Sequence, residues 1–203
     1  MRHAHARGER TCWAAACDVA DEGSVRRLGE VARDRLGTVD ILVNNAGVSA
    51  SAPLRKITLA DWNRMLAVNA TGTFLCTREF VPGMVERGWG RVVNIASMVG
   101  LEGGKYVSHY SAAKHAVIGF TRSVALEIAG TGVTMNAVCP GYVDSPMTDQ
   151  TLANVEARAG LTREKALAAV LASAGQERLV TAEEVAAAVL VLCRDDAGGT
   201  NGR

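Results

Sequence analysis

A tyrosine and a lysine stand four residues apart in the stretch SHYSAAKHAV, at Tyr110 and Lys114. Helix residues at this spacing are neighbours on one face, so a phenol and an ammonium can point into the same cleft. There they could act as a catalytic pair. The same spacing also occurs on ordinary solvated helix faces, and the pair by itself leaves both interpretations open.

The size and charge of the chain indicate an ordinary globular domain. It has 203 residues, 48% of them hydrophobic and 21% charged, which is typical of a soluble protein with one core. Its 22 basic residues balance 21 acidic ones, so no net field favours a nucleic acid or an anionic membrane. No apolar run approaches the about 20 residues of a membrane-spanning helix. We expect a single domain over residues 1–203 with neither kind of partner.

The cysteines and the N-terminus bear on the compartment. The five cysteines include no Cys-x-x-Cys pair, which indicates reduced thiols in place of disulfides or a metal site. The first ten residues, MRHAHARGER, contain no apolar stretch of the kind found in a secretory signal. The sequence therefore predicts a cytoplasmic protein, and it suggests no metal ligands.

Apolar runs alternate with helical periodicity along the chain. Runs typical of buried strands cover residues 11–20, 39–48, 91–97 and 132–141, and helical spacing covers residues 22–37 and 58–88 and the region around Tyr110. This alternation favours an α/β fold with a Rossmann-like, doubly wound parallel sheet.

Local signals mark the helix boundaries. Capping boxes, at Thr58 with Asp61 and at Thr181 with Glu184, predict two helix starts, and the second of these helices should end near Cys193. Pro82 should kink the helix over residues 58–88 or mark its late turn. Residues 146–175 form a long excursion rich in Ala and Leu, which we expect to be a mostly helical, mobile lid over the substrate.

In open parallel sheets, ligands bind outside the carboxyl ends of the strands. The predicted strand ends carry Asp18, the NNAG stretch of residues 44–47, Ser97 and the PGYVDS stretch of residues 140–145. Tyr110 lies early in the helix that follows the Ser97 strand, so it should reach the same edge. Polar and glycine residues thus gather where a cofactor would lie.

These stretches occur in the order that is typical of the short-chain dehydrogenase/reductase family. The chain resembles that family in DV at Asp18, NNAG at Asn44, VNATG around Asn69, NIAS ending at Ser97, YSAAK from Tyr110 to Lys114, and NAVCPGYVDSPM from Asn136. The resemblance covers nearly the whole chain. It implies an NAD(P)-dependent oxidoreductase that interconverts a secondary alcohol and a ketone.

The resemblance also implies roles for four catalytic residues. Tyr110 would protonate the ketone oxygen, and Lys114 would stabilise the phenolate and hold the cofactor ribose. Ser97 would position the carbonyl oxygen, and Asn69 would support a water that relays protons toward Lys114. Hydride comes from the nicotinamide. A 3-oxoacyl or acetoacetyl-type reductase and a sugar or polyol dehydrogenase both remain open as the substrate class.

Further positions match the cofactor-binding residues of the family. Besides Tyr110 and Lys114, the resemblance implies contacts to NAD or NADP from Asp18, Val19, Asn45, Ala46, Gly47, Pro140, Gly141, Val143 and Ser145. Asp18 could instead cap a turn, and Asn44 is interpreted as structural. Ser145 stands where the family more often has threonine. The resemblance further implies a homodimer or homotetramer formed through the helices of Asn69 and Tyr110.

Two departures from the family pattern qualify this assignment. No glycine-rich phosphate-binding loop precedes Asp18, so we expect the first two strands of the sheet to be missing, and the last strand also. On this interpretation the chain is a truncated reductase. The alternative function is therefore a non-catalytic remnant that keeps the four catalytic residues but cannot hold a dinucleotide.

Overall fold

The computed structural model describes residues 12–203, which contain a three-stranded parallel sheet. Its strands are β1 (Ile41–Asn44), β2 (Gly90–Ile95) and β3 (Val133–Val138), and they lie side by side in the order β1-β2-β3. Ile41 pairs with Arg91, and Gly90 pairs with Val133, so all three strands run in the same direction. The predicted α/β fold with a parallel sheet is confirmed.

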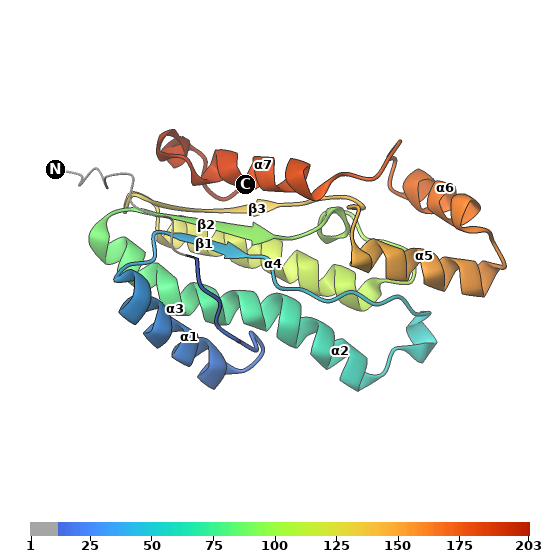
Figure 1. The fold of residues 1–203 in the computed structure, drawn as a ribbon, viewed down its shortest axis with the longest axis horizontal. Helices are drawn as coiled ribbons and strands as arrows, with labels where there is room; N and C mark the ends of the chain where they lie inside the picture. Colours follow the sequence, from blue (N-terminus) through green and yellow to red (C-terminus); the bar gives the residue numbers. More distant parts are fainter. Residues whose placement is uncertain (1–11) are drawn as a thin grey trace.

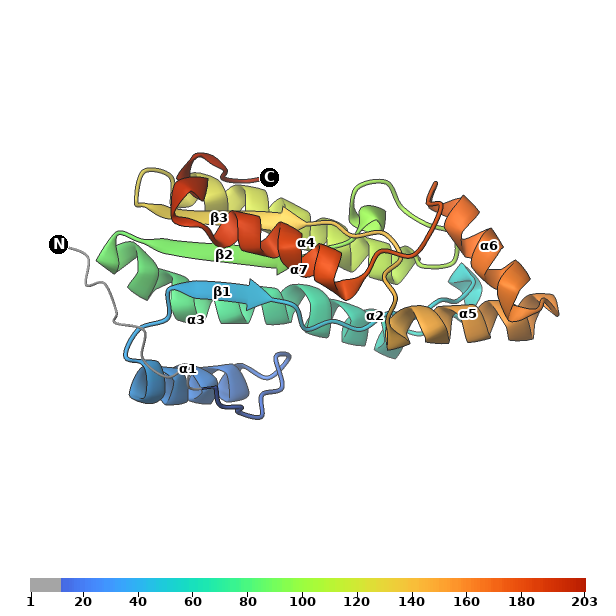
Figure 2. The same ribbon diagram turned by 45° about the horizontal axis from the view of Figure 1, so that its top comes forward.

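Helices cover both faces of this sheet (Figure 1). One face carries α1 (Glu22–Leu36), α3 (Gly72–Arg87) and α4 (Ser108–Glu127), and α7 (Ala182–Cys193) lies on the other. The remaining helices are α2 (Leu59–Leu66), which leads into α3, and α5 (Pro146–Ala159) and α6 (Arg163–Ser173). Figure 2 shows α5 and α6 beyond the carboxyl ends of the strands, where the predicted lid should lie.

Both predicted capping boxes are present. Thr58 accepts a hydrogen bond from the backbone N–H of Asp61, and the Asp61 carboxylate accepts one from the backbone N–H of Thr58. Thr181 and Glu184 do the same at the start of α7, which ends at Cys193 as expected. These side chains bond backbone groups that the first helical turn leaves free, so the sequence alone was sufficient to locate them.

The helix predicted over residues 58–88 departs from regular geometry near its middle. Pro82 lies inside α3, and the helix continues beyond it to Arg87. The irregular turn is a π-helical segment, Ala67–Thr71, which contains Asn69. Such π turns occur often at functional sites, and periodicity in the sequence does not reveal them.

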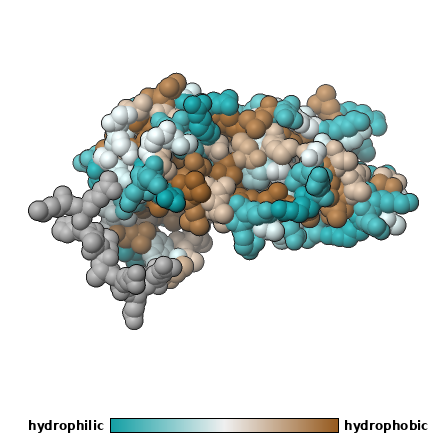
Figure 3. All heavy atoms as spheres, turned by 90° about the horizontal axis from the view of Figure 1, so that it is seen from above, coloured by the Kyte–Doolittle hydropathy of each residue, from teal (hydrophilic) through white to brown (hydrophobic). Residues whose placement is uncertain are grey.

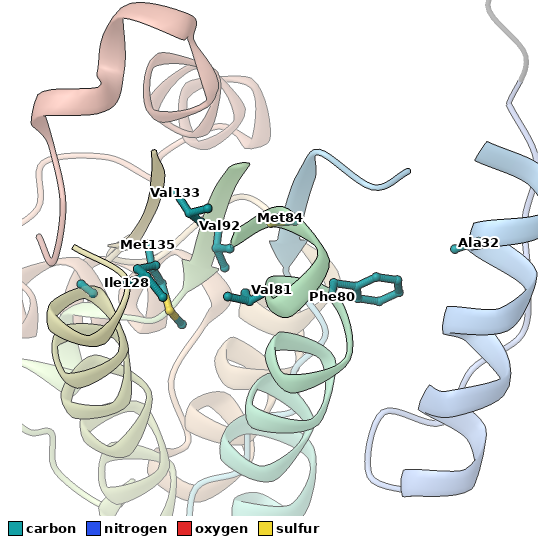
Figure 4. Packing of buried hydrophobic residues seen from close by; sticks show 9 residues of the cluster. Ala32, Phe80, Val81, Met84, Val92, Ile128, Val133 and Met135 are labelled. Atoms are coloured by element: carbon teal, nitrogen blue, oxygen red, sulfur yellow. The ribbon is translucent and has the colours of Figure 1, made fainter. Parts of the chain in front are cut away.

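The main hydrophobic core lies between the sheet and its helices α3 and α4 (Figure 4). Val92 from β2 and Met135 from β3 are buried against Val81 and Met84 of α3. Phe80 points from α3 toward α1 (Figure 4). The other face is less well covered, because no residue of α7 is fully buried. Figure 3 views the molecule from the α7 side and shows hydrophobic residues at the surface among hydrophilic ones.

The strand predicted at residues 11–20 is wrong for its described part. Residues 12–18 adopt no strand, and Cys12 to Ala16 are exposed. A strand needs a lateral partner, and within residues 12–203 the free edge of β1 has none. Residues 1–11, where the sequence lacks a secretory signal, lie outside the described part.

The expectation of missing strands is not confirmed. At the other side of the sheet, the end of the described chain lies against β3. The N–H of Gly202 donates to the carbonyl of Met135 at 2.9 Å, and the N–H of Ala137 donates to the carbonyl of Arg203 at 2.6 Å. Among the described residues, no helix is both long and apolar enough to cross a membrane.

Candidate active site

Ser97 lies just beyond β2, where pairing with the segment after β3 holds its backbone. The N–H of Ala96 donates to the carbonyl of Val138 at 2.8 Å, and the N–H of Met98 donates to the carbonyl of Pro140 at 2.9 Å. Ser97 sits between these two bonds. Its hydroxyl makes a side-chain hydrogen bond with Tyr110, which brings the strand end and the α4 helix together.

Tyr110 and Lys114 occupy the first turns of α4 and face inward. Lys114 is only 5% exposed, and its ammonium donates a 2.7 Å hydrogen bond to the carbonyl of Ile95. Its Nζ atom lies 5.7 Å from the centroid of the Tyr110 ring. The interpretation of this pair as residues of a solvated face is therefore wrong. Because the phenol lies near both the ammonium and the Ser97 hydroxyl, these groups can act on one bound molecule.

Burial favours the uncharged forms of both residues and shifts their pKa values accordingly. It raises the pKa of the Tyr110 phenol, and the hydrogen bond with Ser97 acts in the opposite direction. It lowers the pKa of the Lys114 ammonium from 10.5 to about 8. The net shift at Tyr110 is thus upward, whereas the expected action of Lys114 on the phenolate would lower its pKa. At neutral pH Tyr110 is protonated, as a proton donor must be.

Asn69 is buried in the π turn, and its amide binds a neighbouring loop. Its Nδ2 donates to the carbonyl of Val48 at 2.9 Å, and its Oδ1 accepts from the N–H of Val48 at 3.2 Å. A second bond from Nδ2 reaches the carbonyl of Met65 at 2.9 Å. A Cβ atom on Gly47 would come within 2.9 Å of Asn69 Oδ1 and 3.7 Å of Lys114 Nζ. Gly47 thus lets this loop approach Lys114 closely.

The NNAG stretch follows β1 and divides into buried and exposed residues. Asn44 is buried and donates to Asn94 Oδ1 at 2.8 Å, which confirms its structural interpretation. Asn45 and Ala46 are exposed and, together with Val19, line a cavity of about 160 Å³ between α1, β1 and α3. The structure therefore brings three of the predicted cofactor residues to one cavity.

Asp18 is not among the residues that line this cavity. Its carboxylate accepts a 2.9 Å hydrogen bond from the N–H of Ala20, and its own N–H donates to Ser24 Oγ at 3.0 Å. These local bonds match the alternative in which Asp18 caps a turn. Its predicted contact with a cofactor has no support from its surroundings.

The predicted nicotinamide residues form one connected segment after β3. Pro140 binds the backbone beyond Ser97, and Val143 forms an isolated parallel bridge with Val180. The Ser145 hydroxyl accepts a 3.4 Å hydrogen bond from the N–H of Thr148 and so caps α5. This segment thus joins the strand end to the first lid helix. Residues 146–175 are mostly helical as predicted, and their mobility stays a prediction.

Comparison with known proteins decides the family. The sequence pattern of the short chain dehydrogenase family matches residues 1–156, more than half of the chain. The chain belongs to this family. This short-chain dehydrogenase is 38% identical over 187 residues to a D-beta-hydroxybutyrate dehydrogenase of Rhizobium meliloti (strain 1021). The matched region covers 91% of this chain and 72% of that relative.

Two further proteins are similar to this short-chain dehydrogenase. It is 35% identical over 185 residues to an acetoacetyl-CoA reductase of Cupriavidus necator, covering 91% of this chain and 71% of the relative. The crystal structure of a variant of actinorhodin polyketide ketoreductase with NADPH superposes with a TM-score of 0.87 at 37% identity, covering 92% of this chain and 72% of that one. The protein is thus an NAD(P)-dependent oxidoreductase that uses NAD or NADP.

Two residues at the site had no role assigned from the sequence. The Tyr142 hydroxyl is close enough to Tyr110 to raise the pKa of that phenol further. The Gln176 side chain bonds the backbone of Tyr142 across a separation of 34 residues. Tyr142 lies within the PGYVDS stretch that the sequence placed at a strand end, and this position could have indicated it, whereas Gln176 carries no such signal.

Proposed function

We propose that this short-chain dehydrogenase interconverts a secondary alcohol and a ketone at a centre formed by Ser97, Tyr110 and Lys114. The observation that carries the proposal is the Tyr110 ring, which lies 5.7 Å from the buried Lys114 ammonium and interacts with the Ser97 side chain. A protonated phenol and a second hydroxyl at one point can together bind a single carbonyl oxygen.

In the reductive direction, a bound reduced nicotinamide would supply hydride to the carbonyl carbon. Tyr110 donates its phenolic proton to the oxygen, which becomes the alcohol hydroxyl. Ser97 donates a hydrogen bond that holds this oxygen in place, and the Lys114 ammonium stabilises the phenolate that remains. Asn69 holds the adjoining loop at Val48 and supports the path by which a proton returns to Lys114.

The residues at the strand ends fit a dinucleotide in part. An ammonium has three N–H donors, and Lys114 uses one of them on Ile95, so two are available to ribose hydroxyls. Gly47 admits a close approach beside it. We propose cofactor contacts for Val19, Asn45, Ala46, Gly47, Tyr110, Lys114, Pro140, Gly141, Val143 and Ser145. Asp18 is the weakest member of the predicted set.

The substrate class that we propose is a 3-oxoacyl or 3-hydroxyacyl compound. An acetoacetyl-CoA reductase and a D-beta-hydroxybutyrate dehydrogenase, whose names describe such compounds, are both similar to this chain. The lid over residues 146–175 would select among them, because it adjoins the site through Ser145.

We propose further that copies of the chain pair through α3 and α4 as a homodimer or homotetramer. Phe74 on α3 is 39% exposed and Leu126 on α4 is 80% exposed, and a symmetric contact between these helices would cover both. The five cysteines are all free, which favours a reducing compartment such as the cytoplasm.

Binding and turnover measurements test the reaction. The chain is titrated with NADH and NADPH while nicotinamide fluorescence is recorded, and circular dichroism of the same sample establishes that it is folded. Oxidation of NAD(P)H is then followed with 3-oxoacyl thioesters and with the ketone forms of polyols. We expect saturable binding and faster turnover of the thioesters. A folded chain that binds neither nucleotide would support the non-catalytic alternative.

A further inference from the structure

The two ends of the lid meet at a single point. The chain enters α5 after the Gly141–Val143 segment and returns from α6 at Gln176. There the N–H of Val180 donates to the carbonyl of Tyr142 at 3.0 Å, and the N–H of Asp144 donates to the carbonyl of Val180 at 2.8 Å. Residues before and after the lid are therefore joined like neighbouring strands, directly beside the proposed nicotinamide segment.

The side chain of Gln176 completes this junction. Its Oε1 accepts a 2.7 Å hydrogen bond from the N–H of Tyr142, and its Nε2 donates to the carbonyl of Tyr142 at 3.3 Å. One amide thus binds both backbone groups of one residue, as a paired strand does. A Cβ atom on Gly141 would lie only 2.4 Å from Gln176 Oε1, so only glycine leaves room for the amide at this place.

The junction is also tied to α7. Gln176 Nε2 donates a further hydrogen bond to the carbonyl of Arg178 at 3.3 Å. The Arg178 guanidinium binds both carboxylate oxygens of Glu184, at 2.8 and 2.6 Å, and Glu184 belongs to the capping box of α7. Since α7 packs on the sheet, Gln176 is held against a fixed part of the molecule.

Tyr142 connects this junction with the reaction centre. Its ring packs on the apolar core of the lid, formed by Leu152, Ala166 and Val170. Its hydroxyl acts electrostatically on Tyr110. A shift of the Tyr142 backbone would therefore move the lid core and the surroundings of Tyr110 together.

We propose that Gln176 is a positioning residue, whose amide holds the Gly141–Tyr142 peptide so that the lid and the nicotinamide segment keep one geometry for the reaction. The inference rests on the proposed function, because it assigns the ketone to the space beside Tyr110. Within residues 12–203, the side-chain hydrogen bonds of Gln176 go to the backbone of Tyr142 and Arg178 and not to Tyr110. Any effect of Gln176 on the reaction centre therefore passes through Tyr142.

The test compares Gln176→Leu and Gln176→Glu with the control Asn63→Leu, which removes an exposed amide from α2, outside the lid. Leucine keeps the size of glutamine and removes all of its hydrogen bonds. Glutamate keeps the acceptor for the Tyr142 N–H and loses the donors. For Gln176→Leu we expect kcat/KM for a 3-oxoacyl thioester to fall roughly tenfold and the NADPH dissociation constant to rise by a similar factor, as loss of the two hydrogen bonds to Tyr142 implies. Gln176→Glu should recover part of the loss, and Asn63→Leu should match the wild type.

Hydrogen exchange supplies a readout that needs no cofactor. In Gln176→Leu the amides of residues 141–145 should exchange roughly ten times faster than in the wild type, while those of α4 keep their rates. Unchanged exchange and unchanged kcat/KM in a folded Gln176→Leu protein would overturn the proposal. If the wild type binds no NADPH, the proposed function fails, and the exchange comparison still decides whether Gln176 holds the junction.

Discussion

The ammonium of Lys114 donates a 2.7 Å hydrogen bond to the carbonyl oxygen of Ile95, the last residue of β2. This bond joins the first turns of α4 to the strand end that precedes Ser97. Lys114 is only 5% exposed, and this burial lowers the pKa of its ammonium to about 8. A charge that destabilises the fold is thus kept beside the proposed proton donor, as the proposed stabilisation of the phenolate requires.

Replacing Lys114 by methionine should stabilise the protein and inactivate it. Methionine has a similar size and no charge to desolvate, and the lost bond to Ile95 offsets part of the gain. We expect the free energy of unfolding at neutral pH to rise by about 1–2 kcal/mol and turnover to fall at least about a hundredfold. Urea denaturation and NADPH oxidation measure the two effects. Lys56→Met, at an exposed lysine outside the lid and the site, is the control and should change neither.

The stability difference should depend on pH. The pKa of Lys114 is about 8 in the folded state, below its ordinary 10.5, so the folded state loses this proton first. Between about pH 8 and pH 10, Lys114 keeps its proton in the unfolded chain but has lost it in the folded protein. A rise in pH over this window therefore increases the free energy of unfolding of the wild type. The advantage of Lys114→Met should shrink over this window. An advantage that stays constant with pH would contradict a buried ammonium.

The two directions of the reaction should respond oppositely to pH. Reduction needs the Tyr110 proton and the Lys114 cation, so its rate should fall as Lys114 loses its proton with a midpoint near pH 8. Oxidation needs the phenolate of Tyr110, whose pKa is raised, so its rate should keep rising in alkaline solution. Profiles of kcat/KM between about pH 6 and pH 10 measure both directions. A reductive midpoint near pH 6 would assign the titration to another group.

Features set by neighbouring residues could be predicted from the sequence, and features set by distant contacts could not. Thr58 and Asp61 lie within one helical turn of each other, and their capping box is where the sequence places it. The run around Cys12 has the composition of a strand, but a strand exists only beside a partner, and none of the described residues supplies one. The bond from Gln176 to Tyr142 spans 34 residues and follows no spacing rule.

The candidate site divides in the same way. The positions of Ser97, Tyr110 and Lys114 follow from the order of strands and helices, because the ends of parallel strands meet at one edge. The pKa shifts at Tyr110 and Lys114 follow from burial, which depends on packing that the sequence does not state. Burial raises the pKa of the Tyr110 phenol, and the stabilisation of its phenolate by Lys114 stays a prediction.

Replacing Tyr110 by phenylalanine tests the proton donor. The change removes one hydroxyl and leaves the ring in place, so the fold and the binding of NADPH should be retained. We expect turnover to fall about a thousandfold, within the range that general acid catalysis supplies. NADPH fluorescence titration and steady-state kinetics separate binding from turnover. Tyr106→Phe, at a 55% exposed tyrosine, is the control. Near-normal turnover of Tyr110→Phe would show that the proton comes from elsewhere.

Replacing Asn69 by alanine should loosen the loop that carries Gly47. The change removes the bonds from the Asn69 amide to the backbone of Val48 and to the carbonyl of Met65, and it leaves these buried groups without partners. We expect the free energy of unfolding to fall by about 2–3 kcal/mol. Because Gly47 lies next to Lys114, the NADPH dissociation constant should also rise, and fluorescence titration measures it. Asn63→Ala on the exposed side of α2 should leave both quantities unchanged. If Asn69→Ala keeps its stability and loses only turnover, Asn69 acts in proton transfer and not in holding the loop.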